Sequence, residues 1–408
     1  MTRILTAVCL SLILALPLAA EDWPQWLGPR RDGTATSTVA PWTGELKTLW
    51  RVPVGEGHSS PIVAEGKVFW HAKVADADEE EVVAADAKTG VRLWRQTYSR
   101  PPFKSQFGNG PRSTPLFDQG RLYTVGVTGL LTCWEAASGT RQWQIDLLKE
   151  FEAENLFFGF STSPLIVDDK LIVMVGGAKA CLVALDKKSG ERRWTTGSAR
   201  ASYASPTLIE QGGQPLVVAL SAEGLLAVRP ADGHVAWTSP LRDMLNESST
   251  TPIRVGDRLL ASSVTFGSKV VRLTEKENRP AIEEGWRNAR LTCYFGTPVA
   301  VGGDVYLVTG RLVPPAQADL HCVDAETGQI RWTRPKVGTY HATLLKAADR
   351  ILMLEETGTL VLIEPRATEY TELARAKVCR TTWAHPALVD GLLVVRDDRE
   401  LAAIALPR

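Results

Sequence analysis

Eight short segments of the chain carry most of the histidine, arginine and aromatic side chains that could bind a ligand. Their sequences are GEGHSSP, GPRSTP, GFSTSP, ARASYASP, NESSTTP, CYFGTP, GTYHAT and TTWAHP. The candidate binding residues in them are His58, Arg112, Phe160, Arg200, Tyr203, Phe295, Tyr340, His341, Trp383 and His385. Brought together, they would form a mixed cationic and aromatic ring that suits a planar, anionic or carbohydrate ligand, or an extended peptide. The alternative is that these residues only fill the centre of the fold and hydrogen-bond the strand ends.

Other catalytic or metal-binding patterns are weak or missing in the sequence. No two histidines have metal-ligand spacing, and the acidic runs near Asp76 and Asp397 indicate solvated loops, so no metal site is predicted. The strings G-x-S-x-G and H-E-x-x-H and the phosphate-binding P-loop do not occur, and no catalytic residue is predicted. The 46 basic and 46 acidic side chains balance, which leaves no electrostatic basis for binding nucleic acid or an anionic membrane surface.

The elements that must position the candidate residues repeat about every 47 residues. The repeat is marked by Trp50, Trp94, Trp143, Trp194, Trp237, Trp286 and Trp332. Five of these tryptophans end the phrase acid-x-x-(Ser/Thr/Asp)-Gly-x-x-x-Trp, although Arg229 replaces the acid in one copy. The acid can accept backbone N–H bonds of a tight turn, and glycine supplies the positive φ that such a turn requires. The phrase therefore predicts a hairpin whose second strand carries the tryptophan.

A second phrase opens each unit with a short strand, a Gly- or Asp-rich turn and another short strand, as in SSPIVAEGKVF at 59–69. It occurs eight times, so each unit contributes about four antiparallel strands. Radial repetition of four-stranded units forms a β-propeller, because each blade then covers the faces of its neighbours. We therefore predict an all-β, eight-bladed propeller in which the candidate segments meet at one end of the axis. The outer-strand tryptophan would dock between adjacent blades, with its indole N–H on a backbone carbonyl.

The two ends of the chain predict how the ring closes. The eighth opening phrase begins at His385 and leaves room for three strands before Arg408, whereas Trp50 has no unit before it. We expect residues 46–54 to supply the missing outer strand of the eighth blade, which removes a sheet edge. The predicted organisation is a lead-in segment at 21–45 and one propeller over 46–408.

Residues 1–20 have the features of a signal peptide. Arg3 precedes an apolar run over 4–18, and the small residues Ala19 and Ala20 follow it. Cleavage near Ala20 would release a protein to the periplasm or the exterior, and an uncleaved N-terminal anchor is the alternative. No other stretch is apolar enough to span a bilayer, so we expect an exported protein with no transmembrane segment in its mature part.

The D-x-x-T/S-G-x-x-x-W strings and the Trp-rich start, DWPQWLGPRRDG at 22–33, resemble the repeats of pyrroloquinoline-quinone-binding-type β-propellers. The resemblance runs from about Asp22 to the C-terminus and implies one of two functions. Quinoprotein alcohol dehydrogenases of this type bind the quinone and calcium on the propeller axis and typically carry two adjacent cysteines. Non-catalytic relatives, such as a periplasmic propeller lipoprotein that assists outer-membrane protein assembly, bind neither.

The cysteines favour the non-catalytic kind. Cys9, Cys133, Cys181, Cys293, Cys322 and Cys379 include no adjacent pair. We therefore expect an exported binding or scaffold propeller that holds a protein, a peptide or a small ligand at its axial face and uses no cofactor. One alternative is a calcium-dependent pyrroloquinoline quinone oxidoreductase of the alcohol or sugar dehydrogenase type, which would need quinone and calcium. The other is a carbohydrate-active propeller.

Overall fold

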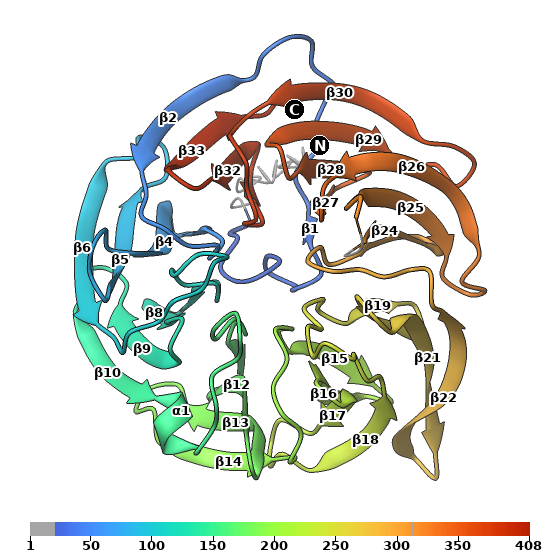
Figure 1. Ribbon diagram of the computed structural model, residues 1–408, viewed down its shortest axis with the longest axis horizontal. Helices are drawn as coiled ribbons and strands as arrows, with labels where there is room; N and C mark the ends of the chain where they lie inside the picture. The colour runs from blue at the N-terminus through green and yellow to red at the C-terminus, as the bar shows by residue number, and fades with distance from the viewer. Residues whose placement is uncertain (1–20, 312–313) are drawn as a thin grey trace, which may run out of the picture.

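Eight sheets stand around a central axis in the computed structural model, which describes residues 21–311 and 314–408 (Figure 1). Each has four antiparallel strands, and one of them gains a short fifth strand. Strands within each blade are antiparallel neighbours, and the Trp-bearing strands form the outer rim. This arrangement confirms the predicted all-β, eight-bladed propeller. The predicted signal peptide at 1–20 lies outside the described residues. None of the described segments forms a helix with the length and apolarity that crossing a bilayer requires.

The first four blades follow the first four predicted units in chain order. Blade 1 consists of β3 (Ile62–Ala64), β4 (Lys67–Lys73), β5 (Glu79–Asp86) and β6 (Arg92–Ser99). Blade 2 consists of β7 (Leu116–Asp118), β8 (Arg121–Val125), β9 (Leu130–Glu135) and β10 (Arg141–Asp146), and the short helix α1 (Leu147–Glu150) follows it. Blade 3 consists of β11 (Leu165–Val167), β12 (Lys170–Gly177), β13 (Ala180–Asp186) and β14 (Arg192–Thr196). Blade 4 consists of β15 (Thr207–Gln211), β16 (Gln214–Ser221), β17 (Gly224–Val228) and β18 (Val235–Pro240).

The other four blades complete the ring. Blade 5 consists of β19 (Ile253–Val255), β20 (Arg258–Ser263), β21 (Gly267–Lys276) and β22 (Arg279–Asn288). Blade 6 consists of β23 (Val299–Val301), β24 (Asp304–Gly310), β25 (Ala318–Asp324) and β26 (Ile330–Gly338). Blade 7 consists of β27 (Ala342–Ala347), β28 (Arg350–Glu355), β29 (Thr359–Glu364) and β30 (Thr371–Lys377), with β1 (Thr34–Ala35) added beside β27. Blade 8 consists of β31 (Ala387–Val389), β32 (Leu392–Arg396), β33 (Glu400–Ala405) and β2 (Lys47–Pro53).

An aspartate closes the turn between the third and fourth strands in blades 1, 3 and 6. Oδ1 of Asp86 accepts hydrogen bonds from the backbone N–H groups of Lys88 and Thr89, at 3.1 and 2.9 Å. Asp186 and Asp324 accept equivalent bonds in their own blades. Hydrogen bonds from the side chain and backbone of Thr89 stabilise the carboxylate of Asp86 and lower its pKa. The predicted role of the acid as the acceptor of backbone N–H bonds is confirmed in these three blades, whereas Glu135 of blade 2 accepts the hydroxyl of Ser138.

The repeated tryptophans bind the turn of the next blade. Nε1 of Trp50 in blade 8 donates to the carbonyl oxygen of Ala87 in blade 1 at 2.9 Å, and Trp94 donates likewise to Ala136 at 3.0 Å. The same bond to a carbonyl of the following blade is made by Trp194, Trp286 and Trp332. Trp237 donates to the side chain of Gln211 instead, and Nε1 of Trp143 is buried without a hydrogen-bond partner among the described residues.

The glycine of each repeated phrase lies against the tryptophan of the preceding blade. A Cβ atom placed on Gly90, which has a φ of 71°, would come within 2.8 Å of the Trp50 ring. The same close approach to the preceding tryptophan occurs at Gly139, Gly190, Gly233 and Gly328. Each blade therefore places its glycine against the tryptophan of the preceding blade and its tryptophan against the glycine of the following blade. This contact explains why the two residues recur together.

Replacing Gly90 by alanine tests this contact against a matched control. Gly66 has the same φ of 71° but has no atom within 4 Å of the position that a Cβ would take. Gly66→Ala should lower the free energy of unfolding by about 1 kcal/mol, the cost of a left-handed backbone alone. Gly90→Ala should cost about 1–3 kcal/mol more, because the methyl group must displace Trp50. Urea unfolding followed by tryptophan fluorescence measures both, and equal losses would contradict the contact.

The first and last parts of the chain share blade 8. Strand β2 pairs antiparallel with β33, from Lys47 opposite Ala405 to Pro53 opposite Glu400. The closing strand predicted at 46–54 is therefore present, and it spans 47–53. Strand β2 therefore covers β33 and gives blade 8 four strands, with β2 as its outer edge.

The lead-in segment enters the centre of the ring and contacts blades 1 and 2 through its backbone. Trp23 exchanges two backbone hydrogen bonds with Val63 of blade 1, at 2.8 and 2.9 Å. The carbonyl oxygen of Pro24 accepts a bond of 2.7 Å from the N–H of Phe117, which lies in blade 2. Further along the segment, β1 pairs in parallel with β27 and so attaches the segment to blade 7.

Two side chains of the same segment reach the middle of the ring. The buried guanidinium of Arg31 donates to the carbonyl oxygens of Ser163 and Pro164 in blade 3, at 3.1 and 2.7 Å. Burial lowers the pKa of Arg31 to about 9. Nε1 of Trp26 donates to Oγ1 of Thr251, which precedes blade 5, at 2.8 Å. Residues 22–35 therefore link blades 1, 2, 3, 5 and 7, and we refer to them as the axial plug (Figure 1).

Candidate functional site

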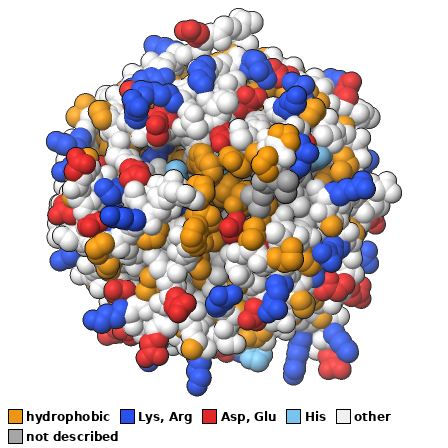
Figure 2. Space-filling view, viewed as in Figure 1, with side chains coloured by type: hydrophobic (Ala, Val, Ile, Leu, Met, Phe, Trp, Pro, Cys, Tyr) orange, Lys and Arg blue, Asp and Glu red, His pale blue; other side chains and the backbone are white. Residues whose placement is uncertain are grey.

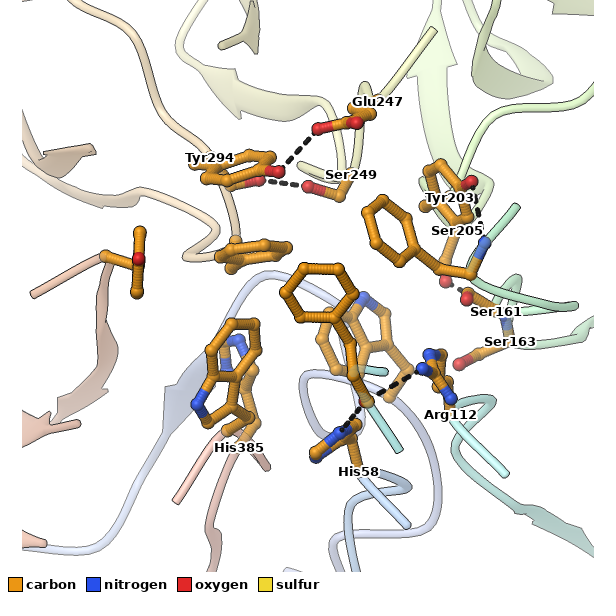
Figure 3. A pocket seen from close by; sticks show the side chains of 16 residues that line it. His58, Arg112, Ser161, Ser163, Tyr203, Ser205, Glu247, Ser249, Tyr294 and His385 are labelled. Carbon is orange, nitrogen blue, oxygen red and sulfur yellow. Dashed lines mark hydrogen bonds between the residues drawn. The ribbon is translucent and has the colours of Figure 1, made fainter. Parts of the chain in front are cut away.

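A pocket of about 530 Å³ lies at the propeller axis, and Trp26 of the axial plug forms part of its wall. Most of the other lining residues lie in loops that precede the first strand of a blade (Figure 3). Hydrophobic side chains gather at the centre of the face shown in Figure 2. The residues that line the pocket are Trp26, His58, Phe107, Arg112, Phe158, Ser161, Ser163, Tyr203, Ser205, Glu247, Ser249, Tyr294, Phe295, Tyr340, Trp383 and His385.

Hydrogen bonds between adjacent blades hold the loops around the axis. Oγ of Ser163 accepts the N–H of Thr114, and Oγ of Ser205 accepts the N–H of Ser163, both at 2.9 Å. Oγ of Ser60 accepts the N–H of His385 across the junction between blades 8 and 1, at 3.0 Å. The accepting hydroxyls belong to the Ser-Pro pairs of the opening phrases. This part of the repeat therefore sets the spacing of the loops that carry the candidate residues.

Two aromatic clusters form the walls on either side of the pocket (Figure 3). In one cluster, the ring centroid of Phe158 lies 5.2 Å from that of Phe107 and 5.4 Å from that of Tyr203. In the other cluster, the ring centroids of Phe295 and Trp383 are 4.7 Å apart. Tyr294 stacks on Phe295, and Tyr340 lies beside Trp383. We refer to these as the Phe158 cluster and the Phe295 cluster.

Arg112 and Glu247 are the two charged side chains in the pocket lining, and both form hydrogen bonds with other groups of the protein. The guanidinium of Arg112 donates to the carbonyl oxygens of Gly110, Phe107 and Gly108, at 3.0 to 3.1 Å. Burial lowers the pKa of Arg112 to about 10, so it remains charged at neutral pH. Glu247 accepts a hydrogen bond from the hydroxyl of Tyr294, and burial together with this bond raises the pKa of Tyr294.

The histidines of the site are neutral at pH 7. Burial, with a smaller effect of the Arg112 charge, lowers the pKa of His58 to about 4, and burial lowers that of His385 to about 4. Burial and the neighbouring histidines lower the pKa of His341 to about 3. The expected mixed ring is therefore less cationic than the composition of the loops indicated, because burial disfavours the charged imidazole.

His58 and His385 differ in their hydrogen bonding. Nε2 of His58 donates to the carbonyl oxygen of Phe107 at 3.0 Å, next to the bond from Arg112 (Figure 3). His385 packs edge-on against Trp26, with ring centroids 4.6 Å apart. Neither ring nitrogen of His385 has a hydrogen-bond partner among the described residues. His58 therefore supports the Phe107 loop, whereas His385 retains unused donor and acceptor capacity at the pocket wall.

Seven of the ten candidate binding residues line the pocket, and three lie elsewhere. His341 is buried behind the Phe295 cluster, with its ring centroid 5.0 Å from that of Trp383. Phe160 belongs to the hydrophobic core between blades 2 and 3. Arg200 is exposed and lines a separate polar cavity with Glu223 and Asp243. Other residues of the same three loops line the pocket, but these three side chains do not.

Several lining residues were not among the sequence candidates. Trp26 comes from the axial plug, and Phe107 and Phe158 come from long connections that carry no repeated phrase. Glu247 and Tyr294 lie in candidate segments, so their type and position could have identified them. The serines Ser163 and Ser205 belong to the Ser-Pro pairs of the opening phrases, a signal that recurs in the sequence.

The ring of four-stranded blades with its axial pocket defines a β-propeller of the pyrroloquinoline-quinone type, as the repeat phrases implied. The chain belongs to the family described as outer membrane protein assembly factor BamB, which matches residues 38–106, 78–334 and 283–405. A relative of that name from Yersinia pestis is 23% identical over 303 residues, which cover 69% of this chain and 71% of the relative.

Two solved structures share the fold. BamB from Moraxella catarrhalis matches with a TM-score of 0.62 and 16% identity, over 89% of this chain and 98% of that chain. Quinohemoprotein alcohol dehydrogenase from Comamonas testosteroni matches with a TM-score of 0.67 and 13% identity, over 94% of this chain and 80% of that chain. At such identities the likeness shows the fold alone, so the choice between binding and catalysis depends on the residues of the pocket.

The residues of the pocket do not fit pyrroloquinoline quinone with calcium. The quinone carries three carboxylates, whereas Arg112 is the one cationic side chain in the lining and already donates to three carbonyl oxygens. Glu247 is the one carboxylate in the lining, and the described residues contain no group of three or more His, Cys, Asp and Glu side chains that could hold a metal ion. Calcium requires several oxygen ligands.

Proposed function

We propose that the chain is an exported, non-catalytic propeller that binds a protein partner at its axial pocket. The family to which it belongs is named for outer membrane protein assembly, and we propose a related role in the periplasm. In this proposal, residues 1–20 direct export, residues 21–45 include the axial plug, and residues 46–408 form the binding propeller.

The Phe158 and Phe295 clusters carry the proposal. Aromatic rings provide large contact areas with few rotatable bonds, and for this reason they dominate the binding energy of many protein interfaces. The apolar surface continues beyond the pocket, because Phe157 is 73% exposed and Met244 is 81% exposed in loops that also supply lining residues. Exposed apolar side chains beside an aromatic pocket mark an interaction site more often than a single exposed side chain does. An extended segment of a partner could insert apolar side chains between the two clusters.

Photocrosslinking of the full chain in its source cells tests the proposal. A photoreactive phenylalanine analogue at Phe157 should form crosslinks to envelope proteins, whereas the analogue at Val91, which is exposed on the outer turn of blade 1, should not. Trp383→Ala combined with Phe295→Ala should reduce the Phe157 crosslinks about tenfold or more, because it removes the centre of one aromatic cluster. Equal crosslinking from both positions, or crosslinks that the double substitution leaves unchanged, would refute binding at the axis.

A direct assay separates this proposal from the quinoprotein alternative. Purified protein is mixed with pyrroloquinoline quinone and calcium, and the quinone absorbance and dye-linked oxidation of alcohols and sugars are followed. We expect no stoichiometric uptake and no turnover. Stoichiometric uptake of the quinone together with oxidation of an alcohol or sugar would show that the protein is an oxidoreductase and would refute the proposed non-catalytic function.

A further inference from the structure

A second, smaller cavity of about 260 Å³ adjoins the axial pocket between blades 8 and 1. His58, Phe107 and Trp383 line both cavities, so the two share a wall. The remaining walls differ in chemistry, because the smaller cavity contains the carboxylates of Glu56, Asp397 and Asp398. An aromatic compartment therefore lies beside an acidic one.

The charges of the acidic compartment are not all available to a ligand. Asp397 is buried, and its carboxylate accepts the backbone N–H groups of Arg380, Arg399 and Glu400. The nearby guanidinium of Arg396 is also buried and donates to backbone carbonyl oxygens. These two groups therefore have structural roles at the junction of blades 8 and 1.

Glu56 and Asp398 remain as the accessible negative charges. Glu56 is exposed, and its Oε1 accepts the N–H of Asn109 at 2.7 Å, which places the carboxylate beside the loop that carries Phe107. Asp398 is 63% exposed and has the exposed Arg399 as a neighbour at 3.8 Å. Of the two, Glu56 is the stronger recognition element, because Asp398 has Arg399 at 3.8 Å, whereas the Arg112 charge reaches Glu56 only at longer range and is shared with three carbonyl oxygens.

Phe107 separates the two compartments, and hydrogen bonds to its backbone carbonyl oxygen fix its position. Its carbonyl oxygen accepts bonds from His58 and Arg112, and its side chain is 44% exposed. A ligand that contacts both faces of this wall would place an apolar group against the aromatic clusters and a second group against Glu56. The charge of Glu56 favours a cationic second group.

We propose that the partner segment carries an aromatic or large aliphatic side chain two positions away from a lysine or arginine. This inference rests on the proposed function, because it assumes that the axial pocket receives an extended peptide. In an extended chain, side chains two positions apart lie on the same side, so both would point into the adjoining compartments. The apolar side chain enters the aromatic pocket, and the basic side chain reaches Glu56 and Asp398.

Binding of short peptides to the full-length protein tests the proposal. The probe is a fluorescein-labelled octapeptide with phenylalanine and lysine two positions apart in a glycine and serine background. Companion peptides replace the lysine by glutamine or glutamate, or the phenylalanine by alanine. By fluorescence anisotropy at low salt, the lysine peptide should bind about fivefold more tightly than the glutamine peptide, and the glutamate peptide should bind most weakly. The preference for lysine should decrease as salt is added.

Substitution of the two carboxylates should remove the preference without removing binding. With Glu56→Gln and Asp398→Asn together, the lysine and glutamine peptides should bind within about twofold of each other. Glutamine at position 56 retains an oxygen that can accept the Asn109 N–H, so the Phe107 loop should stay in place. The matched control is Glu326→Gln, an exposed carboxylate on the outer turn of blade 6, which should leave the preference intact.

The peptide series also separates the two proposals. If the phenylalanine peptides bind more tightly than the alanine peptide but show no preference for lysine, the acidic compartment is not a recognition element and the inference is wrong. If phenylalanine gives no advantage over alanine, peptide binding at the aromatic pocket is itself refuted. A preference for glutamate would overturn the charge assignment.

Discussion

Acidification from about pH 7.5 to pH 5 is expected to lower the free energy of unfolding by about 5–6 kcal/mol. Burial lowers the folded-state pKa values of His58, His341 and His385 to about 4, 3 and 4, from the ordinary histidine value of 6.5. The unfolded chain therefore binds more protons than the folded chain below about pH 6.5. Stability falls as the pH falls through this window, until the folded histidines also protonate near pH 4 to 3. Urea unfolding followed by tryptophan fluorescence at several pH values measures the loss.

Variants of the buried histidines identify the source of this pH dependence. His341→Phe combined with His385→Phe should remove more than half of the loss, because these two imidazoles then no longer titrate, whereas His58 and His321, whose pKa is also lowered by burial, still do. The smaller change His385→Asn should remove about one third. His234→Asn alters an exposed histidine on the outer turn of blade 4 and should leave the slope unchanged. A double variant with the slope of the unsubstituted protein would show that other groups govern the acid response.

Trp50→Ala is expected to lower the free energy of unfolding by about 3–5 kcal/mol. The ring of Trp50 is 8% exposed, lies against Gly90 and donates to the carbonyl oxygen of Ala87. It is also the tryptophan that joins the closing blade to blade 1. Its removal therefore leaves a cavity and an unpaired carbonyl where the two ends of the ring meet. Urea unfolding midpoints and thermal melting measure the loss.

A neighbour on the same strand provides the control. Leu49 is 42% exposed on β2, and Leu49→Ala should cost about 0.5–1 kcal/mol. Deletion of residues 21–54 should go further, because it exposes β33 as an unpaired edge and promotes aggregation. A truncated chain that melts at the temperature of the full protein would refute the role of β2 in closing the ring.

The architecture could be predicted from the sequence because its contacts are local and repeated. The acid, the glycine and the tryptophan of one phrase each have a role that recurs in most blades, so the spacing alone identifies a blade. The closing strand was predictable because Trp50 lacked a unit of its own. The axial plug was not predictable, since Trp23 and Arg31 bind the backbone of distant blades, and backbone partners leave no pattern in the sequence.

The candidate site was predictable in position and less so in detail. Loops that precede the innermost strands of a propeller converge on the axis, which located His58, Tyr203 and Trp383 correctly at the pocket. The direction of each side chain depends on local backbone geometry, so Arg200 and Phe160 point elsewhere. The protonation states of the histidines depend on burial, which a single sequence does not reveal.

The pairing of β2 with β33 has a consequence for how the molecule is made. Strands β2 and β33 are far apart in the sequence, so blade 8 can be completed only after both have formed and the rest of the ring has brought them together. Loss of either strand would leave seven blades intact and the eighth incomplete.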